Sequence, residues 1–155
     1  MAGKIEAHIK TLGLVLPSAS APVANYVPFV RTGALVFVSG QLPLQDGAVK
    51  CIGLVGDGVT VEQAYEAAKL CALNLIAQAK AACNGDLDKV MRVVKLTGFV
   101  AAGPTFTDHP KVINGASDLM VQVFGEAGRH SRAAVGAASL PRGAAVEVEA
   151  VFEVM

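Results

Sequence analysis

The sequence predicts an α+β fold in which two helices pack on one face of a mostly antiparallel or mixed sheet. Two internal segments carry apolar residues at the spacing of a helix. The segments around them are short, rich in valine and bounded by Gly or Pro, as strands are. The resulting order, after a short leading helix, is strand, strand, a third short strand, helix, strand, helix, strand, strand. This order is typical of a layered α+β architecture.

Both internal helices have recognisable start signals. Thr60 and Gln63 match a capping box that opens the first helix, and Asn84-Gly85 supplies its stop. Asp108 with Pro110 opens the second helix. The apolar residues of the two predicted helices are Val61, Ala64, Ala67, Ala68, Cys71, Leu75 and Ala79 in the first, and Val112, Ala116, Leu119, Met120 and Val123 in the second.

The strands are predicted from turns and β-branched runs. Residues 26–31 and 34–39 read as two strands joined by a tight turn at Thr32-Gly33. Residues 49–55 could form another strand, and residues 90–100 are rich in β-branched side chains. The last two strands are expected at about 132–138 and 145–154.

At 155 residues, the chain is expected to form a single domain, 1–155, with residues 1–20 as a helical N-terminal extension. Ile5, Ile9 and Leu12 place a short helix there that ends before Gly13 or Pro17. A hydrophobic share of 53% and a mean hydropathy of +0.50 indicate apolar surface that is buried in a homo-oligomer.

Charge and cysteine content exclude several functional classes. Thirteen basic and thirteen acidic side chains cancel, so no net field attracts nucleic acid or an anionic membrane. No apolar run is long enough to span a bilayer. Three cysteines without a Cys-x-x-Cys pair argue against a disulfide framework or thiolate metal site and place the protein in the cytoplasm.

Arg132 is the first candidate for binding chemistry. It opens a strand of small, uncharged residues, and the two-residue period places Ala134 and Gly136 on its face. Small neighbours leave space beside a guanidinium, whose planar donors match a carboxylate. The alternative is a structural arginine at a strand end, and residue type alone favours that alternative.

Glu147 is the second candidate. It shares one face of the last strand with Glu149 and Glu153, which by itself describes a solvated sheet face. If that strand pairs with the strand of Arg132, a glutamate comes near the arginine. In a partly dry pocket, such a carboxylate can hold or transfer a proton.

The histidines and glycine-rich segments are weaker candidates. His8, His109 and His130 lack metal-ligand spacing, so no metal site is predicted. His130 stands two residues before Arg132 and either lines the same site or forms a turn. Gly53–Gly58 lacks the Gly-Lys-Ser/Thr of a phosphate loop and is interpreted as a flexible connection.

Four blocks of the sequence resemble the Rid/YjgF family. They are Tyr26, the run Gly33-Ala-Leu-Val-Phe-Val-Ser-Gly-Gln-Leu-Pro43, Arg132, and the run Leu140-Pro-Arg-Gly-Ala-Ala-Val-Glu-Val-Glu-Ala150. The resemblance extends from about Tyr26 to Phe152. It implies a chorismate-mutase-like sheet with two helices on one face, a homotrimer, and a cleft between subunits.

The resemblance also implies an activity: hydrolysis of reactive 2-imino or enamine acids, such as 2-aminoacrylate, to 2-keto acids and ammonia without a cofactor. Arg132 would hold the substrate carboxylate with help from the backbone N–H of Gly40, and Glu147 would position water and transfer its proton. The other cleft residues that it implies are Tyr26, Ser39 and Asn114, with His130 and Ala134 beside them. The alternative is a non-catalytic trimer that binds small carboxylates as a sensor or regulator.

Departures from the family pattern indicate a divergent, longer subgroup. Ala134 stands where deaminating members carry cysteine, and His130 stands where proline or alanine is usual. Pro28 replaces a glutamine that commonly follows the tyrosine. These changes lie at the expected cleft, so they bear on the shape of the pocket and on the choice of substrate.

Overall fold

The computed structural model describes residues 3–21 and 24–155; the first two residues of the predicted extension, and residues 22 and 23, lie outside the described residues. Three α-helices and nine strands are formed within the described part of the chain. The helices are α1 (Lys4–Thr11), α2 (Val61–Ala82) and α3 (His109–Phe124). The strands are β1 (Phe29–Thr32), β2 (Leu35–Gln41), β3 (Leu44–Gln45), β4 (Ala48–Val49), β5 (Leu54–Val55), β6 (Gly58–Val59), β7 (Val90–Ala101), β8 (Ser131–Ala137) and β9 (Val146–Val154).

The main sheet has five strands in the order β1-β2-β9-β7-β8. β7 and β8 run parallel, and the other neighbouring pairs are antiparallel. The parallel pair is connected by α3, since parallel neighbours need a crossover rather than a hairpin. The C-terminal strand β9 therefore lies in the middle of the sheet, between β2 and β7.

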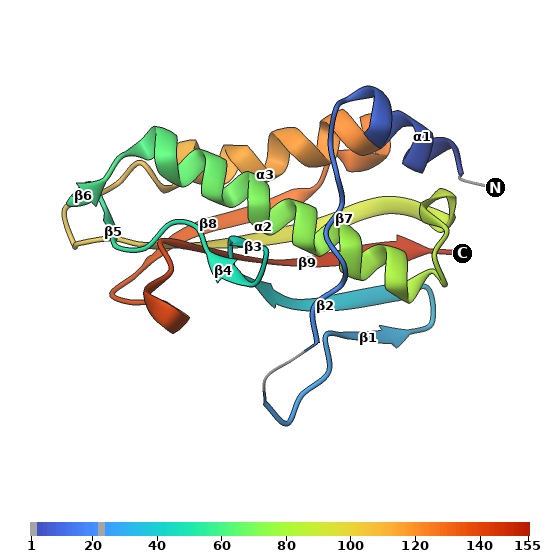
Figure 1. The fold of residues 1–155 in the computed structure, drawn as a ribbon, viewed down its shortest axis with the longest axis horizontal. Helices are drawn as coiled ribbons and strands as arrows, with labels where there is room; N and C mark the ends of the chain where they lie inside the picture. The colour runs from blue at the N-terminus through green and yellow to red at the C-terminus, as the bar shows by residue number, and fades with distance from the viewer. Residues whose placement is uncertain (1–2, 22–23) are drawn as a thin grey trace.

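Helices α2 and α3 lie side by side on one face of this sheet (Figure 1). The core fills the layer between them and the sheet, and its largest fully buried side chains include Phe152, Leu75, Leu96, Ile113 and Met120. This arrangement confirms the α+β architecture predicted from the order of the elements. No helix among residues 3–21 and 24–155 is both long and apolar enough to cross a membrane.

The start of α2 is the predicted capping box. The Gln63 amide N–H donates to Thr60 Oγ1 at 3.1 Å, and the Thr60 N–H donates to Gln63 Oε1 at 2.9 Å. Small residues then allow α2 to approach α3 closely. A Cβ on Gly115 of α3 would clash with the carbonyl oxygen of Tyr65 on α2, so the helices contact there through their backbones.

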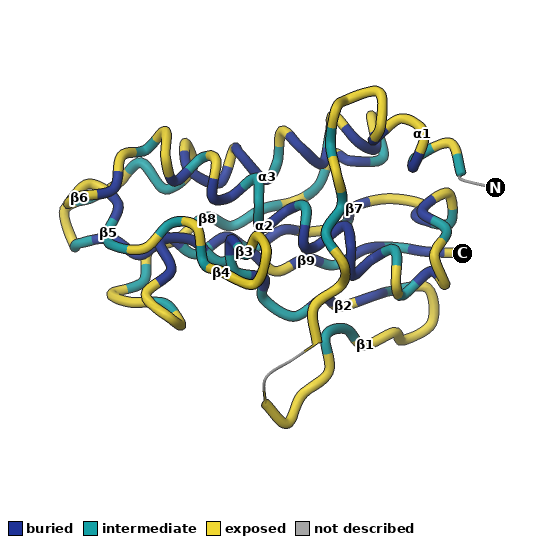
Figure 2. Tube along the Cα trace, viewed as in Figure 1, coloured by how far each residue is buried: buried dark blue, intermediate teal, exposed yellow. Residues whose placement is uncertain are grey.

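No helix of the described residues covers the opposite face of the sheet, and apolar side chains lie exposed there. Val30 is 54% exposed, Phe37 is 47% exposed and Val135 is 44% exposed. Figure 2 shows that exposed and half-buried segments continue along β1 and the neighbouring edge of the sheet. These side chains are the uncovered apolar surface that the composition predicted.

The region between β2 and α2 differs from the prediction of one strand over 49–55. It forms two small two-stranded sheets instead, an antiparallel pair of β3 with β4 and a parallel pair of β5 with β6. Gly53 and Gly56 adopt positive φ angles of 124° and 85°, which a continuous strand does not accommodate. The glycines therefore divide the segment into short pieces.

Candidate functional site

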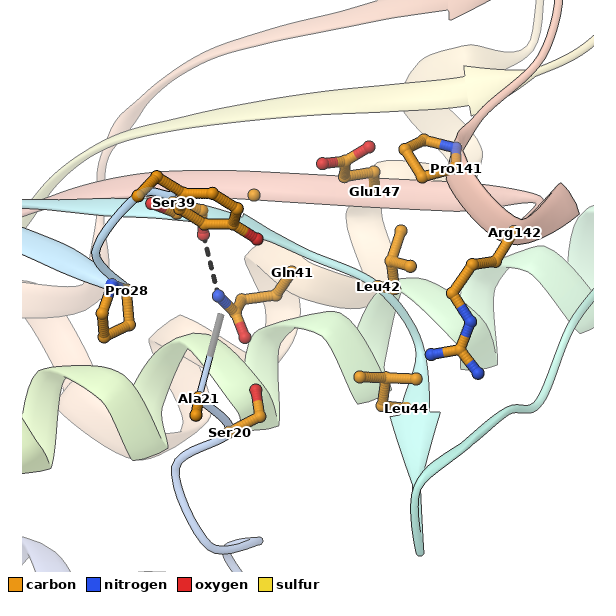
Figure 3. A pocket seen from close by; sticks show the side chains of 12 residues that line it. Ser20, Ala21, Pro28, Ser39, Gln41, Leu42, Leu44, Pro141, Arg142 and Glu147 are labelled. Atoms are coloured by element: carbon orange, nitrogen blue, oxygen red, sulfur yellow. Dashed lines mark hydrogen bonds between the residues drawn. The ribbon is translucent and has the colours of Figure 1, made fainter. Parts of the chain in front are cut away.

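A pocket of about 220 Å³ lies at the end of β2, beside the turn that precedes β9. Four of the predicted site residues, Tyr26, Ser39, Gly40 and Glu147, lie in its wall. Figure 3 shows the Glu147 carboxyl between Ser39 on β2 and Pro141 on the turn. The remaining lining residues, of which only Pro28 was expected at the cleft from the sequence, are Ser20, Ala21, Pro28, Gln41, Leu42, Leu44, Pro141 and Arg142.

Ser39 connects two walls of this pocket. Its hydroxyl donates to the Val27 carbonyl at 2.8 Å, and its N–H donates to the Pro28 carbonyl at 2.9 Å. These bonds attach the segment that carries Tyr26 to the end of β2. The register between β2 and β9 also shifts after Val38, so Ser39 and Gly40 form an irregularity in the strand.

Glu147 is half-buried, and its carboxyl faces the pocket (Figure 3). Partial removal from water raises its pKa above the ordinary value, and the negative charge of Glu149 raises it further. Gly40 lies directly against this carboxyl. A Cβ on Gly40 would come within 3.0 Å of Glu147 Cδ and closer still to Oε1, so only glycine leaves the carboxyl in its place.

Arg132 lies in a different part of the molecule, on the edge strand β8. Its Nη1 donates to Asn114 Oδ1 at 2.8 Å and to Ser117 Oγ at 3.1 Å, both on α3. The ion pairs within the described residues join Lys80 to Glu6, Lys111 to Asp108 and Arg129 to Glu126. The Arg132 guanidinium therefore has neutral acceptors and no carboxylate among those residues.

The structure divides the predicted site into two groups. Tyr26, Ser39, Gly40 and Glu147 line the pocket, whereas Arg132, Asn114 and His130 gather at the β8–α3 contact. Ala134 lies on β8 two residues beyond Arg132 and packs against the core.

The proposed proximity of Arg132 and Glu147 through pairing of their strands is wrong for a single chain. β7 lies between β8 and β9, with Phe99 opposite both Glu147 and Val135. At the usual strand spacing, β8 and β9 are about 10 Å apart. Arg132 also points to the helix layer, while the alternation of β9 directs Glu147 away from the helix-facing Val146 and Val148.

Ser117 is a site residue that the sequence interpretation missed. It lies three positions after Asn114 on α3, so the two side chains share a helix face. That spacing, together with a hydroxyl and an amide beside a predicted arginine strand, is the signal that could have identified it.

A cluster of carboxylates lies elsewhere, where α1 meets the start of β7. One oxygen each from Glu6, Asp86 and Asp88 lies within 4.8 Å of the others. Asp88 accepts hydrogen bonds from the amides of Lys4 and Ile5, both at 2.9 Å. Glu6 Oε1 accepts one from the amide of Leu87 at 2.9 Å. These contacts attach α1 to the rest of the fold.

The sequence and the fold are similar to those of known proteins. Residues 6–153 match the sequence model described as "YjgF/chorismate mutase-like, putative endoribonuclease". The chain belongs to the Rid/YjgF family. The match covers nearly all of the chain and includes both groups of site residues.

Similar proteins support the assignment to the Rid/YjgF family. The chain is 51% identical over 152 residues to Protein TCP17 of Trypanosoma cruzi, covering 97% of this chain and 94% of that protein. It is 34% identical to the RutC family protein y4sK of Sinorhizobium fredii, covering 86% and 90% of the two chains. The crystal structure of Atu1372 from Agrobacterium tumefaciens is similar at a TM-score of 0.91 and 55% identity, covering 97% of this chain and 92% of that one.

Proposed function

We propose that this Rid-family protein hydrolyses reactive 2-imino and enamine acids to 2-keto acids and ammonia, without a cofactor, in a cleft between two copies of the chain. The observation that carries the proposal is the guanidinium of Arg132, which is held in place by Asn114 and Ser117 and has no carboxylate partner within the described residues. An arginine fixed by neutral acceptors and lacking a carboxylate partner among the described residues is suited to an anionic ligand.

The orientation of this guanidinium supports binding of a carboxylate along one edge. Both hydrogen bonds within the described residues come from Nη1, which has two N–H groups to donate. The Nε–H and one Nη2–H point in the same direction along the opposite edge. That edge forms the two-donor fork that a carboxylate accepts.

Glu147 is suited to the proton transfers. Its raised pKa makes it a better base than an ordinary carboxylate and allows it to return the proton later. In the proposed reaction, water oxygen bonds to C2 of the imine while Glu147 takes one water proton and delivers it to the nitrogen. The resulting carbinolamine passes its hydroxyl proton by the same route, the C2–N bond breaks, and ammonia leaves as the carbonyl forms. One water is consumed for each ammonia released.

The separation of Arg132 and Glu147 supports a site shared by two copies. The two side chains project from strands that are not neighbours and toward opposite sides of the sheet. The uncovered sheet face, with Val30, Phe37 and Val135 exposed, offers apolar surface for assembly. We propose a homotrimer, in which Arg132 of one subunit completes the pocket around Glu147 of the next, and a cytoplasmic location.

Ribonuclease activity, which the description of the family model names, is less suited to this chain. The net charge is zero, so the backbone of RNA gains no overall attraction. The histidines also lie at separate places: His8 bonds to the Gln122 carbonyl, His109 stacks edge-on with Phe106, and His130 bonds to Ser117. RNA cleavage that survives Arg132→Ala and stringent purification would favour that activity instead.

The direct test generates 2-aminoacrylate in situ and follows release of the keto acid. We expect acceleration by the wild-type protein, a loss of roughly 10- to 100-fold in kcat/KM for Arg132→Ala, and no change for Arg129→Ala, a nearby exposed arginine. Calorimetry with 2-keto acids separates the alternative: binding without turnover of several imines identifies a non-catalytic carboxylate binder. Absence of both binding and turnover would overturn the proposal.

A further inference from the structure

Arg132 is the first member of a hydrogen-bond chain that continues behind its guanidinium. Ser117 Oγ, which accepts from Arg132 Nη1, lies 2.8 Å from His130 Nε2. His130 Nδ1 lies 2.6 Å from the carbonyl oxygen of Gly128. Three side chains from β8, α3 and the turn before β8 are thus linked to one backbone carbonyl.

The chemistry of these groups determines the direction of every bond. A carbonyl oxygen only accepts, so His130 Nδ1 carries a hydrogen and donates it to Gly128. In the neutral ring, Nε2 is then an acceptor and receives the Ser117 hydroxyl hydrogen. The Ser117 oxygen lone pairs remain directed at Arg132. Successive donors therefore run from Arg132 to Ser117 to His130 to Gly128.

Packing fixes Gly128, which lies at the far end of this hydrogen-bond chain. Gly128 is buried, and a Cβ there would clash with the Met120 carbonyl and lie 2.9 Å from Val121 Cα on α3. Because Gly128 lies directly against the α3 backbone, its carbonyl has little freedom to move. The His130 ring is fixed by that carbonyl, and the Ser117 hydroxyl is oriented by the ring.

We propose that Ser117 and His130 are positioning residues that hold Arg132 Nη1 and thereby present its Nε and Nη2 edge to the carboxylate of the substrate. This inference rests on the proposed function of Arg132. It gives His130 a role behind the arginine rather than in contact with the ligand. It also selects the Nδ1–H tautomer of the neutral ring, because in the other neutral tautomer an unprotonated Nδ1 faces the Gly128 carbonyl oxygen and that hydrogen bond is lost.

Two substitutions of His130 separate the two ends of the ring. A glutamine at 130 places an amide oxygen near the position of Nε2 and keeps an acceptor for Ser117. An asparagine places its amide near Nδ1, so it keeps the donor for Gly128 but loses that acceptor. We expect H130N and S117A to raise the KM, and the Kd for a 2-keto acid, roughly tenfold, with much smaller changes in kcat. H130Q is expected to restore most of the affinity lost in H130N.

The split between KM and kcat distinguishes positioning from a general structural defect. The carboxylate is held equally in the ground and transition states, so loss of its anchor affects binding more than turnover. In an R132K background, S117A is expected to add little, because a lysine has no fork to orient. The control H8N changes a histidine that bonds to the Gln122 carbonyl on α3 and is expected to leave affinity unchanged.

Nitrogen NMR of histidine-labelled protein tests the arrangement without any ligand. We expect His130 to be protonated at Nδ1 and unprotonated at Nε2, with the H130Q spectrum identifying its signals. A wild-type protein that binds no carboxylate but shows this tautomer would remove the proposed function and leave the hydrogen-bond chain intact. Wild-type affinity in both H130N and S117A, or an Nε2–H tautomer, would overturn the positioning role itself.

Discussion

Arg132 and Glu147 are separated within one chain by the whole width of β7, and they project toward opposite sides of the sheet. Neither residue can contact a small molecule held by the other unless two copies of the chain contribute. The proposed cleft between subunits therefore makes predictions that a site within one chain does not.

Mixed oligomers test this directly. Alone, R132A subunits should lose roughly 10- to 100-fold in kcat/KM, and E147Q subunits about a hundredfold or more in kcat. Coexpressed with different tags and purified as mixed trimers, they should recover about a third of the wild-type kcat/KM, because one of the three clefts in every mixed trimer combines an intact arginine with an intact glutamate. Mixed trimers as inactive as their parents would indicate that both residues act from the same chain or that one of them is not used.

The pH profile of kcat/KM should report the raised pKa of Glu147. The base is active when ionised, so the rate should fall as the pH drops through a pKa above that of an ordinary carboxyl group. E149Q removes a negative charge that raises this pKa, so the acid limb should move to lower pH. E153Q, farther along the same face of β9, is the control and should leave the limb in place.

The same shift predicts a change in stability. A glutamate whose pKa is higher in the folded protein than in the unfolded chain stabilises the fold most at pH values below its pKa in the unfolded chain. That stabilisation is lost as the pH rises through its pKa in the folded protein. E147Q should therefore unfold at a higher temperature than wild type near neutral pH. The difference in unfolding temperature should disappear at acid pH, below the pKa of Glu147 in the unfolded chain. Thermal unfolding of both proteins at acid and at neutral pH would test this.

Gly40→Ala should reduce turnover by displacing the carboxyl of Glu147. The added Cβ would overlap Oε1 and approach Cδ, so the carboxyl must move away from its place in the pocket. We expect kcat to fall roughly 10- to 100-fold. Gly103→Ala, where a Cβ meets no atom within 4 Å, should retain wild-type turnover. Equal rates for the two variants would contradict the assigned contact between Gly40 and Glu147.

Asp88→Asn should loosen α1 without affecting the cleft. The amides of Ile5 and Lys4 lower the pKa of Asp88, so the ionised carboxylate is the form that attaches the helix. That attachment should persist at pH values above the pKa of Asp88 in the unfolded chain. It should be lost as the pH falls through the pKa of Asp88 in the folded protein. Hydrogen exchange at the Lys4 and Ile5 amides should accelerate in D88N and remain slow in D57N.

Much of the fold follows from local signals in the sequence. The capping box at Thr60 and Gln63 starts α2 as predicted, because both bonds form between residues three positions apart. Asn84 and Gly85 end that helix in left-handed conformations with φ angles of 54° and 89°. The last two strands lie within two residues of their predicted bounds, since their alternation is a local property.

Other features depend on contacts between distant residues. Residue type and family spacing selected Arg132 and Glu147, but the sequence did not show that β7 would separate their strands, because strand order depends on long-range pairing rather than on periodicity. Ser117 and the orientation of His130 likewise appear only when α3 packs on β8. By itself, the sequence, through its resemblance to the family, selected Arg132 and Glu147 as the candidates for binding a carboxylate and transferring a proton. The tertiary structure decided which nitrogen of the arginine is bonded to α3 and on which side of the sheet each residue lies, because both depend on how the helices and strands pack together.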